Sequence, residues 1–403
     1  MEIKPLWTKL KNSITAESVL FALLYIAACF PFVTFIHFGT DLQPWTLLIA
    51  GIIFAGCVLK KKISLKTQIV KLLLVFFVYV SLIGAYSVVV KDTFWHPLRS
   101  YVNYISLLVL PLAMFFMFRS QRGLQERTIK IAINVWLIVG LVQKYIHPQF
   151  LYEIIAGHRT TASRGVVSLA SEPSFYGYMC IFFLLFVLFF ERHRIFYCIN
   201  LCFQILFLAS SSVTVVYMAV FLGCYLVSCL IHPTKRNLVV GLSGIAAIVL
   251  VWMFILPLVV EHIGGRMGEL LSMLLDDPMS VLADGSIQDR IEHIVMALQG
   301  VVSNYGLPNG FTHFRMMSGY GTALYECGIP GLMIIVLQLV IVYKGNSDNK
   351  TAALAITTGL MIMMFSAVQL ATPLYSAYLA YCCYRYQYQI KGNIQTALPE
   401  EQK

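Results

Sequence analysis

The chain has 403 residues, of which 59% are hydrophobic and only 12% are charged. Soluble domains contain roughly 45–50% apolar and about 25% charged residues, so hydrocarbon must solvate much of this surface. The composition excludes an ordinary soluble enzyme and predicts an all-α, polytopic integral membrane protein with one membrane domain over residues 1–403. The net charge of +10 is scattered over short loops and forms no basic face, so nucleic acid is not an expected partner.

Apolar segments bounded by charged residues recur along the whole chain. A membrane-spanning helix needs about 17–25 mainly apolar residues, and on this criterion we predict about twelve spans. The segments lie near residues 17–36, 44–59, 69–90, 101–118, 129–143, 174–190, 195–210, 213–231, 238–258, 318–343, 352–370 and 372–386.

The Lys and Arg residues orient these spans. Basic residues concentrate in loops that stay in the cytoplasm, and here they concentrate in alternate loops, which predicts that both termini are cytoplasmic. The first span is too long for a cleaved signal peptide and lacks a clear small-residue cleavage site, so we expect an uncleaved anchor. The predicted cytoplasmic segments are 1–17, 60–71, 119–130, 191–194, 232–237, 343–351 and 385–403.

Metal and redox chemistry has little support in the sequence. All ten cysteines fall in predicted spans, and Cys198 and Cys202, one helical turn apart, are expected to pack rather than to bind a metal. Histidines of the outer loops show no paired ligand spacing, and no glycine-rich phosphate loop occurs. No cofactor is therefore predicted.

Two connections on the predicted outer side are long, residues 144–173 and 259–317. In the second, "EHIGGRMGELLSMLL" has apolar residues at helical spacing, which predicts a helix on the membrane surface. A further helix is predicted over "GSIQDRIEHIVMALQGVVSNYG", with Arg290 and His293 together on its polar side. That side is either a solvated face or a site that points into a cavity. The predicted apolar face contains Ile287, Ile291, Ile294, Val295, Leu298 and Val302.

Five arginines lie on these outer loops, on a side that otherwise has few charges: Arg159, Arg164, Arg266, Arg290 and Arg315. Arginine is a permanently charged, planar donor suited to bidentate binding of phosphate. Any one of them can also be an ordinary surface charge or a contact to lipid head groups. Arg164 and Arg290 are the stronger candidates, because each is embedded in an apolar helix start.

The stretch "RGVVSLASEPSFYGY" begins with Arg164 and leads into a predicted helix. Pro173 fits the first turn, and Glu172 at the entry can cap exposed backbone N–H groups. The same carboxylate could instead orient Arg164 or take a proton from a substrate hydroxyl. Deep in a span, Glu326 is either a buried relay group or faces an external cavity.

An outer site has no access to ATP or nucleotide sugars, so its donor must carry its own activation. A lipid diphosphate meets that requirement, and arginines are suited to stabilise it as a leaving group.

Three stretches resemble the O-antigen polymerase and ligase superfamily of bacterial envelope glycan enzymes: "RGVVSLASEPSFYGY", "SIQDRIEHIVMALQGVVSNYGLPNGF" and "MSGYGTALYECGIPGL". Ligases of this superfamily have a histidine eleven residues before the first glycine of a "GIPG"-like turn. Eleven residues before Gly328 stands Met317, followed by Ser318, so the resemblance favours a Wzy-type polymerase. His313 lies one turn away and keeps the ligase as an alternative. The spacing of an arginine, ten residues and a glycine, described for some polymerases, is absent.

The resemblance implies a GT-C-like membrane glycosyltransferase in the bacterial inner membrane, with an extracytoplasmic site. It would join oligosaccharide units carried on undecaprenyl diphosphate, with a chain-length regulator and a flippase as candidate partners. Arg164 and Arg290 would bind the donor diphosphate, and Glu172 or His293 would be the base. Arg159, Arg266 or Arg315 would hold the second carrier lipid, with His313 also at the substrate. Two functions from different classes stay open beside these: a lipid-linked glycan transporter and a non-enzymatic export scaffold.

Overall fold

A computed structural model describes residues 16–34, 36, 40–59, 68–91, 94–160, 165–255, 257, 260, 265–277, 285–311, 316–365 and 372–390. Over these ranges the protein is helical, and the only extended pairing is one antiparallel bridge between Val33 and Ile155. The all-α prediction is confirmed. The α-helices before the second long loop are α2 (Ala16–Cys29), α3 (Trp45–Leu59), α4 (Gln68–Lys91), α5 (Trp95–Ser120), α6 (Glu126–Tyr145), α7 (Pro173–Val187), α8 (Arg194–Phe203), α9 (Ser212–Ile231) and α10 (Lys235–Leu250). The later α-helices are α12 (Gly265–Asp276), α13 (Gly285–Ser303), α14 (Gly319–Gly345), α15 (Lys350–Met363) and α16 (Pro373–Tyr384). The shorter segments are the 3₁₀ turn η1 (Tyr152–Ile154) and the π-helical η2 (Gln204–Ala209), η3 (Val251–Ile255) and η5 (Arg385–Ile390).

Each predicted apolar segment contains one of these helices. Within the described residues, five helices are long and apolar enough to cross a bilayer, and further apolar helices are shorter. These apolar helices are compatible with a multi-pass membrane protein. The number of twelve spans and the GT-C-like arrangement stay predictions. The five long helices cover Pro97–Ser120, Glu126–Tyr145, Ser212–Ile231, Lys235–Phe254 and Gly319–Gly345.

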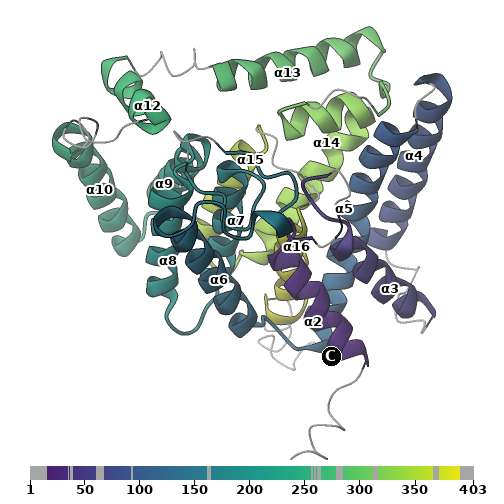
Figure 1. Ribbon diagram of the computed structural model, residues 1–403, viewed down its shortest axis with the longest axis horizontal. Helices are drawn as coiled ribbons and strands as arrows, with labels where there is room; N and C mark the ends of the chain where they lie inside the picture. The colour runs from purple at the N-terminus through teal and green to yellow at the C-terminus, as the bar shows by residue number, and fades with distance from the viewer. Residues whose placement is uncertain are drawn as a thin grey trace, which may run out of the picture.

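Several segments predicted to lie in the cytoplasm contact one another. In Figure 1, α2 begins at the lower edge of the molecule, and α12 and α13 lie at its upper edge. Contacts among predicted cytoplasmic segments join Glu191 to Glu126, Asn237 to Thr351 and Arg385 to Asp348. Two residues of the predicted outer loops contact predicted spans instead, since Thr34 bonds to Ile154 and Phe311 to Ser87. Several predicted cytoplasmic loops thus contact one another, and the compartment that each end faces stays a prediction.

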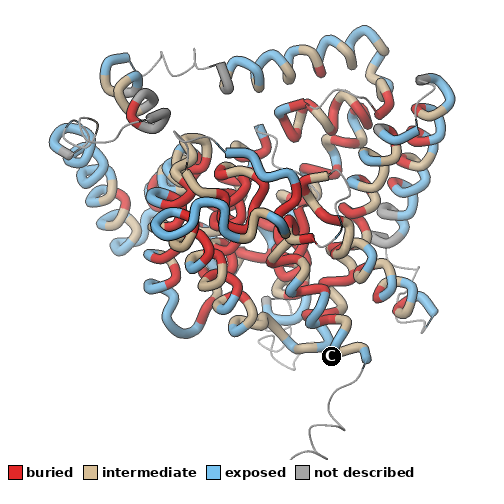
Figure 2. Tube along the Cα trace, in the orientation of Figure 1, coloured by how far each residue is buried: buried red, intermediate tan, exposed pale blue. Residues whose placement is uncertain are grey.

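The core lies around α7, which packs against α6, α8, α9 and α16. All residues of α7 are buried except Ser174 and Leu184. Figure 2 shows the same concentration of buried residues at the centre of the molecule, and mostly exposed residues along α10 at its left edge. This core positions the loop that precedes α7.

The outer helices differ from the bundle helices in how they pack. Helix α13 crosses above α14 at the upper edge (Figure 1) and buries Ala297 against Leu324. Most of its predicted apolar face points away from the protein, since Ile291, Val295 and Leu298 are exposed. An amphipathic helix with an exposed apolar stripe is typical of the membrane interface.

Candidate functional site

The loop before α7 is anchored in the bundle by Gln143 at the end of α6. The Gln143 side chain accepts a hydrogen bond from the backbone N–H of Ser168 (2.6 Å) and donates one to its carbonyl (2.8 Å). The Ser168 hydroxyl donates to the carbonyl of Trp136 (2.7 Å), and Ser168 has a left-handed backbone (φ 50°). Because all these groups are buried, they specify one path for the chain.

The glycine of the "RGVV" stretch permits a close backbone approach. A Cβ on Gly165 would overlap the carbonyl of Ala209 at the end of η2. Beside it, the N–H of Val166 donates to the carbonyl of Leu208 (2.9 Å). Only glycine fits such an approach, so this position is explained by packing.

A charged cluster forms where this loop meets the turn between α2 and α3. The Arg159 Nη2 atom lies 3.1 Å from both carboxylate oxygens of Asp41 and 2.7 Å from Oε1 of Glu172. The backbone N–H of Arg159 donates to the carbonyl of Ser171 (2.6 Å). Three residues far apart in the sequence thus form one cluster at the start of α7.

The first outer turn is held against the loop by short extended contacts. The N–H of Thr34 donates to Ile154 (2.9 Å), and the N–H of Ala156 donates to Phe32 (3.1 Å). Gly157 then turns with φ +58°, which brings the chain against the Asp41 carboxylate. These contacts place Asp41 beneath Arg159.

Opposite charges dominate the electrostatics of the cluster. Partial burial acts to lower the pKa of Arg159, but the charges and hydrogen bonds of Asp41 and Glu172 outweigh it, so the pKa lies above its ordinary value. One guanidinium between two carboxylates leaves one net negative charge. The cluster therefore favours hydrogen-bond donors and cations over an isolated diphosphate.

Glu172 has a different local role from the predicted cap. It occupies the N-cap position of α7, with Pro173 in the first turn as predicted, but its side chain makes no capping hydrogen bond. Its carboxylate instead pairs with Arg159 and accepts a hydrogen bond from the Ser174 hydroxyl (3.1 Å). The prediction that the Glu172 side chain caps α7 is wrong. Arg159 and Ser174 instead hold its carboxylate in one orientation.

The outer helix α13 carries the second group of predicted site residues. His293 Nδ1 accepts a hydrogen bond from the backbone N–H of Met317 (2.9 Å), and Arg290, one turn earlier, is half-buried. With Nδ1 accepting, a neutral imidazole has its proton on Nε2, so that nitrogen is a hydrogen-bond donor in this geometry. The bond joins α13 to the residue just before α14.

Other predicted residues are described in part or not at all. Arg164, His313 and Arg315 lie outside the described residues, and Arg266 is described only as part of the α12 backbone. The predicted pairing of Glu172 with Arg164 stays a prediction for this reason. Among the residues that are described, no group of three or more metal-ligating side chains occurs.

One residue of the cluster escaped the sequence predictions, and the structure gives a partner to Glu326. Asp41 was not predicted, although an acidic residue in a short turn between apolar segments was a usable signal. The buried Glu326 carboxylate accepts a hydrogen bond from Ser100 (2.8 Å), just before a break in α14 at Gly328 (φ 62°, ψ −154°). Glu326 is therefore a buried, hydrogen-bonded carboxylate within the helix packing.

Comparisons with known proteins identify no family. No protein-family model matches the chain, and no curated protein is similar to it. The likeness to envelope glycan enzymes thus stands on the three sequence motifs alone.

Proposed function

We propose that this protein is an extracytoplasmic membrane glycosyltransferase that polymerises oligosaccharide units carried on undecaprenyl diphosphate. The observation that carries this proposal is the Arg159, Asp41 and Glu172 cluster at the entry of α7, of which Glu172 belongs to the first motif that resembles the polymerases. An oriented carboxylate at a membrane boundary is suited to receive the proton of an attacking sugar hydroxyl.

The roles of the charged residues follow from their partners. Arg159 is already paired with two carboxylates, so we assign it to positioning Glu172 rather than to the second carrier lipid. Arg164 and Arg290 remain the candidates for the donor diphosphate, whose leaving-group charge they would stabilise. Arg266 or Arg315 would then hold the second carrier lipid, with His313 nearby.

The general base is Glu172 in this proposal. Its Oε2 atom has one hydroxyl donor, Ser174, and Oε1 is fixed by Arg159, so one lone-pair direction of Oε2 remains for a substrate hydroxyl. His293, whose Nδ1 already accepts from Met317, is better suited to donate through Nε2.

O-antigen ligation is the second candidate function. The observation that favours it is the imidazole of His293 bound at Met317, because this register holds the histidine of the ligases. Such an enzyme would transfer a finished glycan to a different acceptor without extending it.

Gel analysis of lipid-linked and surface glycan from cells that lack the gene separates these functions. A polymerase defect leaves single repeat units on the acceptor without long chains. Full-length glycan stranded on the carrier lipid would replace the proposal with ligation, and accumulation of unprocessed units on the cytoplasmic leaflet would replace it with transport. An unchanged glycan profile would contradict both enzymatic functions.

Complementation with variants then tests the residues. Arg164→Ala and Arg290→Ala should each lower polymer output at least about a hundredfold, the scale of a lost oxyanion donor. Arg127→Ala is the matched control, since Arg127 is an exposed arginine at the opposite end of the bundle. Near-normal polymer from both site variants at equal expression would remove these arginines from the mechanism.

A further inference from the structure

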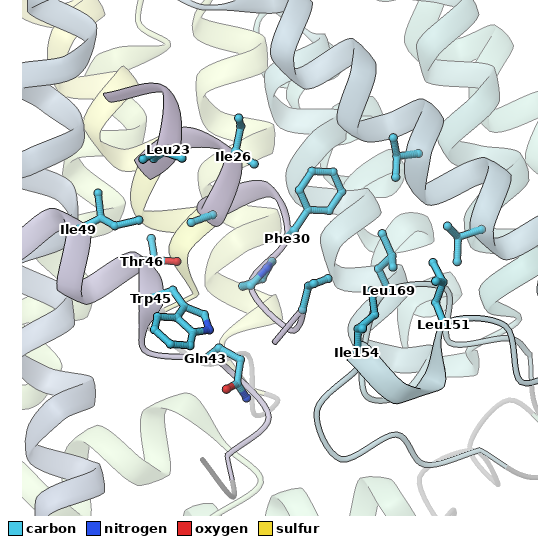
Figure 3. A pocket seen from close by; sticks show the side chains of 15 residues that line it. Leu23, Ile26, Phe30, Gln43, Trp45, Thr46, Ile49, Leu151, Ile154 and Leu169 are labelled. Atoms are coloured by element: carbon cyan, nitrogen blue, oxygen red, sulfur yellow. The ribbon is translucent and has the colours of Figure 1, made fainter. Parts of the chain in front are cut away.

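An apolar groove lies between α2, α3 and α6 and is closed at one end by the loop before α7 (Figure 3). Its volume is about 430 Å³, within the range of about 300–1,000 Å³ that is usual for small-molecule sites. Leu23 and Ile26 on its α2 wall are each 47% exposed, so the groove opens to the outside of the bundle. Its lining includes Leu23, Ile26, Ala27, Ile49, Val135 and Val139.

The position of the groove determines what can fill it. Its walls are apolar helices, and Trp45 lies where α3 begins, as tryptophans do at membrane interfaces. An apolar groove that opens sideways in a bilayer contacts lipid chains rather than water. A hydrocarbon chain is thus the occupant that its lining favours.

The closed end of the groove contains an unsatisfied polar atom. Gln43 lines the groove and is 4% exposed. Its amide nitrogen donates to the carbonyl of Thr40 (2.7 Å), whereas no described residue donates to its Oε1. A buried amide oxygen without a partner destabilises the folded protein. A ligand with a hydrogen-bond donor at this end would remove that destabilisation.

The charged cluster and the closed end of the groove are built from the same two segments, the turn between α2 and α3 and the loop before α7. Asp41 lies two residues before Gln43, and Arg159 follows the groove residue Ile154 after a short turn. Arg159 is paired with Asp41 and Glu172, so the cluster has an excess of negative charge. Beside the apolar groove therefore lie acceptors for a cation.

From this juxtaposition we propose that the groove binds one chain of a zwitterionic aminophospholipid, such as phosphatidylethanolamine, as a resident lipid. Its ammonium group donates to Gln43 Oε1 and to the Asp41 carboxylate. The lipid braces the turn between α2 and α3 against the loop before α7. The head group shares Asp41 with the cluster that positions Glu172, whereas the groove itself has no part in the proposed function.

Native mass spectrometry of the full-length protein from nanodiscs with equal phosphatidylethanolamine and phosphatidylglycerol tests this site. We expect one retained phosphatidylethanolamine per chain in the wild type, and its loss in Ala27→Trp, which fills the groove. Ala247→Trp is the control, because Ala247 is exposed on α10. Equal retention in Ala27→Trp, or equal retention of both lipids by the wild type, would overturn the proposal.

A second variant tests the head group without filling the groove. Gln43→Leu should reduce the preference for phosphatidylethanolamine over phosphatidylglycerol roughly tenfold, the size of one hydrogen bond. Gln338→Leu is its matched control, since Gln338 is also buried with an Oε1 that no described residue pairs, but lies in α14. An unchanged lipid preference in Gln43→Leu would also overturn the proposal. So would displacement of the aminophospholipid by an equal concentration of undecaprenyl phosphate. Both outcomes are independent of glycan polymerisation.

Discussion

Helices α7 and α10 are both strongly apolar, but they occupy opposite environments. Nearly every residue of α7 is buried. In Lys235–Phe254, the apolar segment that contains α10, only 6% of the most apolar stretch is buried. α7 lies at the centre of Figure 1 and α10 at its left edge. In a membrane, hydrophobicity does not decide which helix enters the core, because lipid tails are as apolar as leucine.

Close contacts and buried hydrogen bonds to several neighbouring helices account for the difference. A Cβ on Gly177 of α7 would overlap Thr214 of α9, so the two helices approach closely. Tyr176 of α7 also donates to the buried Gln204 (2.8 Å). Helix α10 packs chiefly against α9, with Gly241 as its one buried residue in the described chain. Close packing and interhelical hydrogen bonds therefore hold α7 in place.

Gly177→Leu should have the largest effect, because a leucine cannot fit against Thr214. Overpacking costs about 1–3 kcal/mol and occasionally more. We expect a clear loss of monodisperse protein in a thermal-stability assay in detergent. Gly223→Leu is the control, since no atom lies within 4 Å of a Cβ built on Gly223. Equal stability of the two variants would show that the approach of α7 and α9 is not tight.

The same isoleucine truncation in the two helices tests the comparison directly. Ile181→Ala on α7 should cost about 2 kcal/mol, because it leaves a cavity in packed protein. Ile248→Ala on α10 should cost less than about 0.5 kcal/mol, because lipid fills the space. Both are measured as shifts in unfolding temperature, and a larger shift for Ile248→Ala would reverse the assignment of core and lipid face.

Gln204→Leu should destabilise the core by about 1–2 kcal/mol, because it removes the shorter hydrogen bond of the Tyr176 hydroxyl and the donor to Asn200 Oδ1. The measurement is resistance to unfolding by a denaturing detergent. The double variant with Tyr176→Phe should recover part of the loss, since both ends of one bond are then removed. No recovery would mean that this bond does not hold α7.

Asp41→Asn should have the smallest effect on stability, below about 1 kcal/mol, because Arg159 is 48% exposed and Glu172 still pairs with it. Polymer output should nevertheless fall if the cluster orients Glu172. Stability is followed by thermal unfolding and output by glycan gels. A loss of stability as large as that of Gly177→Leu would make Asp41 a core residue.

The sequence predicts the helices well because hydropathy and loop charge act locally. Helices in the predicted apolar segments, Pro173 in the first turn and the two outer helices are all found in the structure, although several helix ends differ from the predicted boundaries. The direction in which α13 faces was not predictable, because Ile291 and Val295 point away from the protein and Ala297 into it. An amphipathic pattern marks an apolar face but not whether protein or lipid covers it.

The candidate site was predicted less completely, because its contacts depend on tertiary structure. Arg159 and Glu172 were singled out separately, and their partner Asp41 lies 118 residues before Arg159. Nothing in local sequence brings such distant residues together. The capping role of Glu172 failed for the same reason: a strong cation from another segment competes for the carboxylate.

Reconstitution of the purified protein tests the central claim most directly. Proteoliposomes that contain the full chain and undecaprenyl-diphosphate-linked repeat units, with no other protein, should yield a ladder of longer lipid-linked glycans. The ladder should be lost with Arg290→Ala and kept with Arg127→Ala. The control is that the wild-type protein is folded and present in both orientations in the liposome membrane. If the single units then remain unextended, the result would contradict the account.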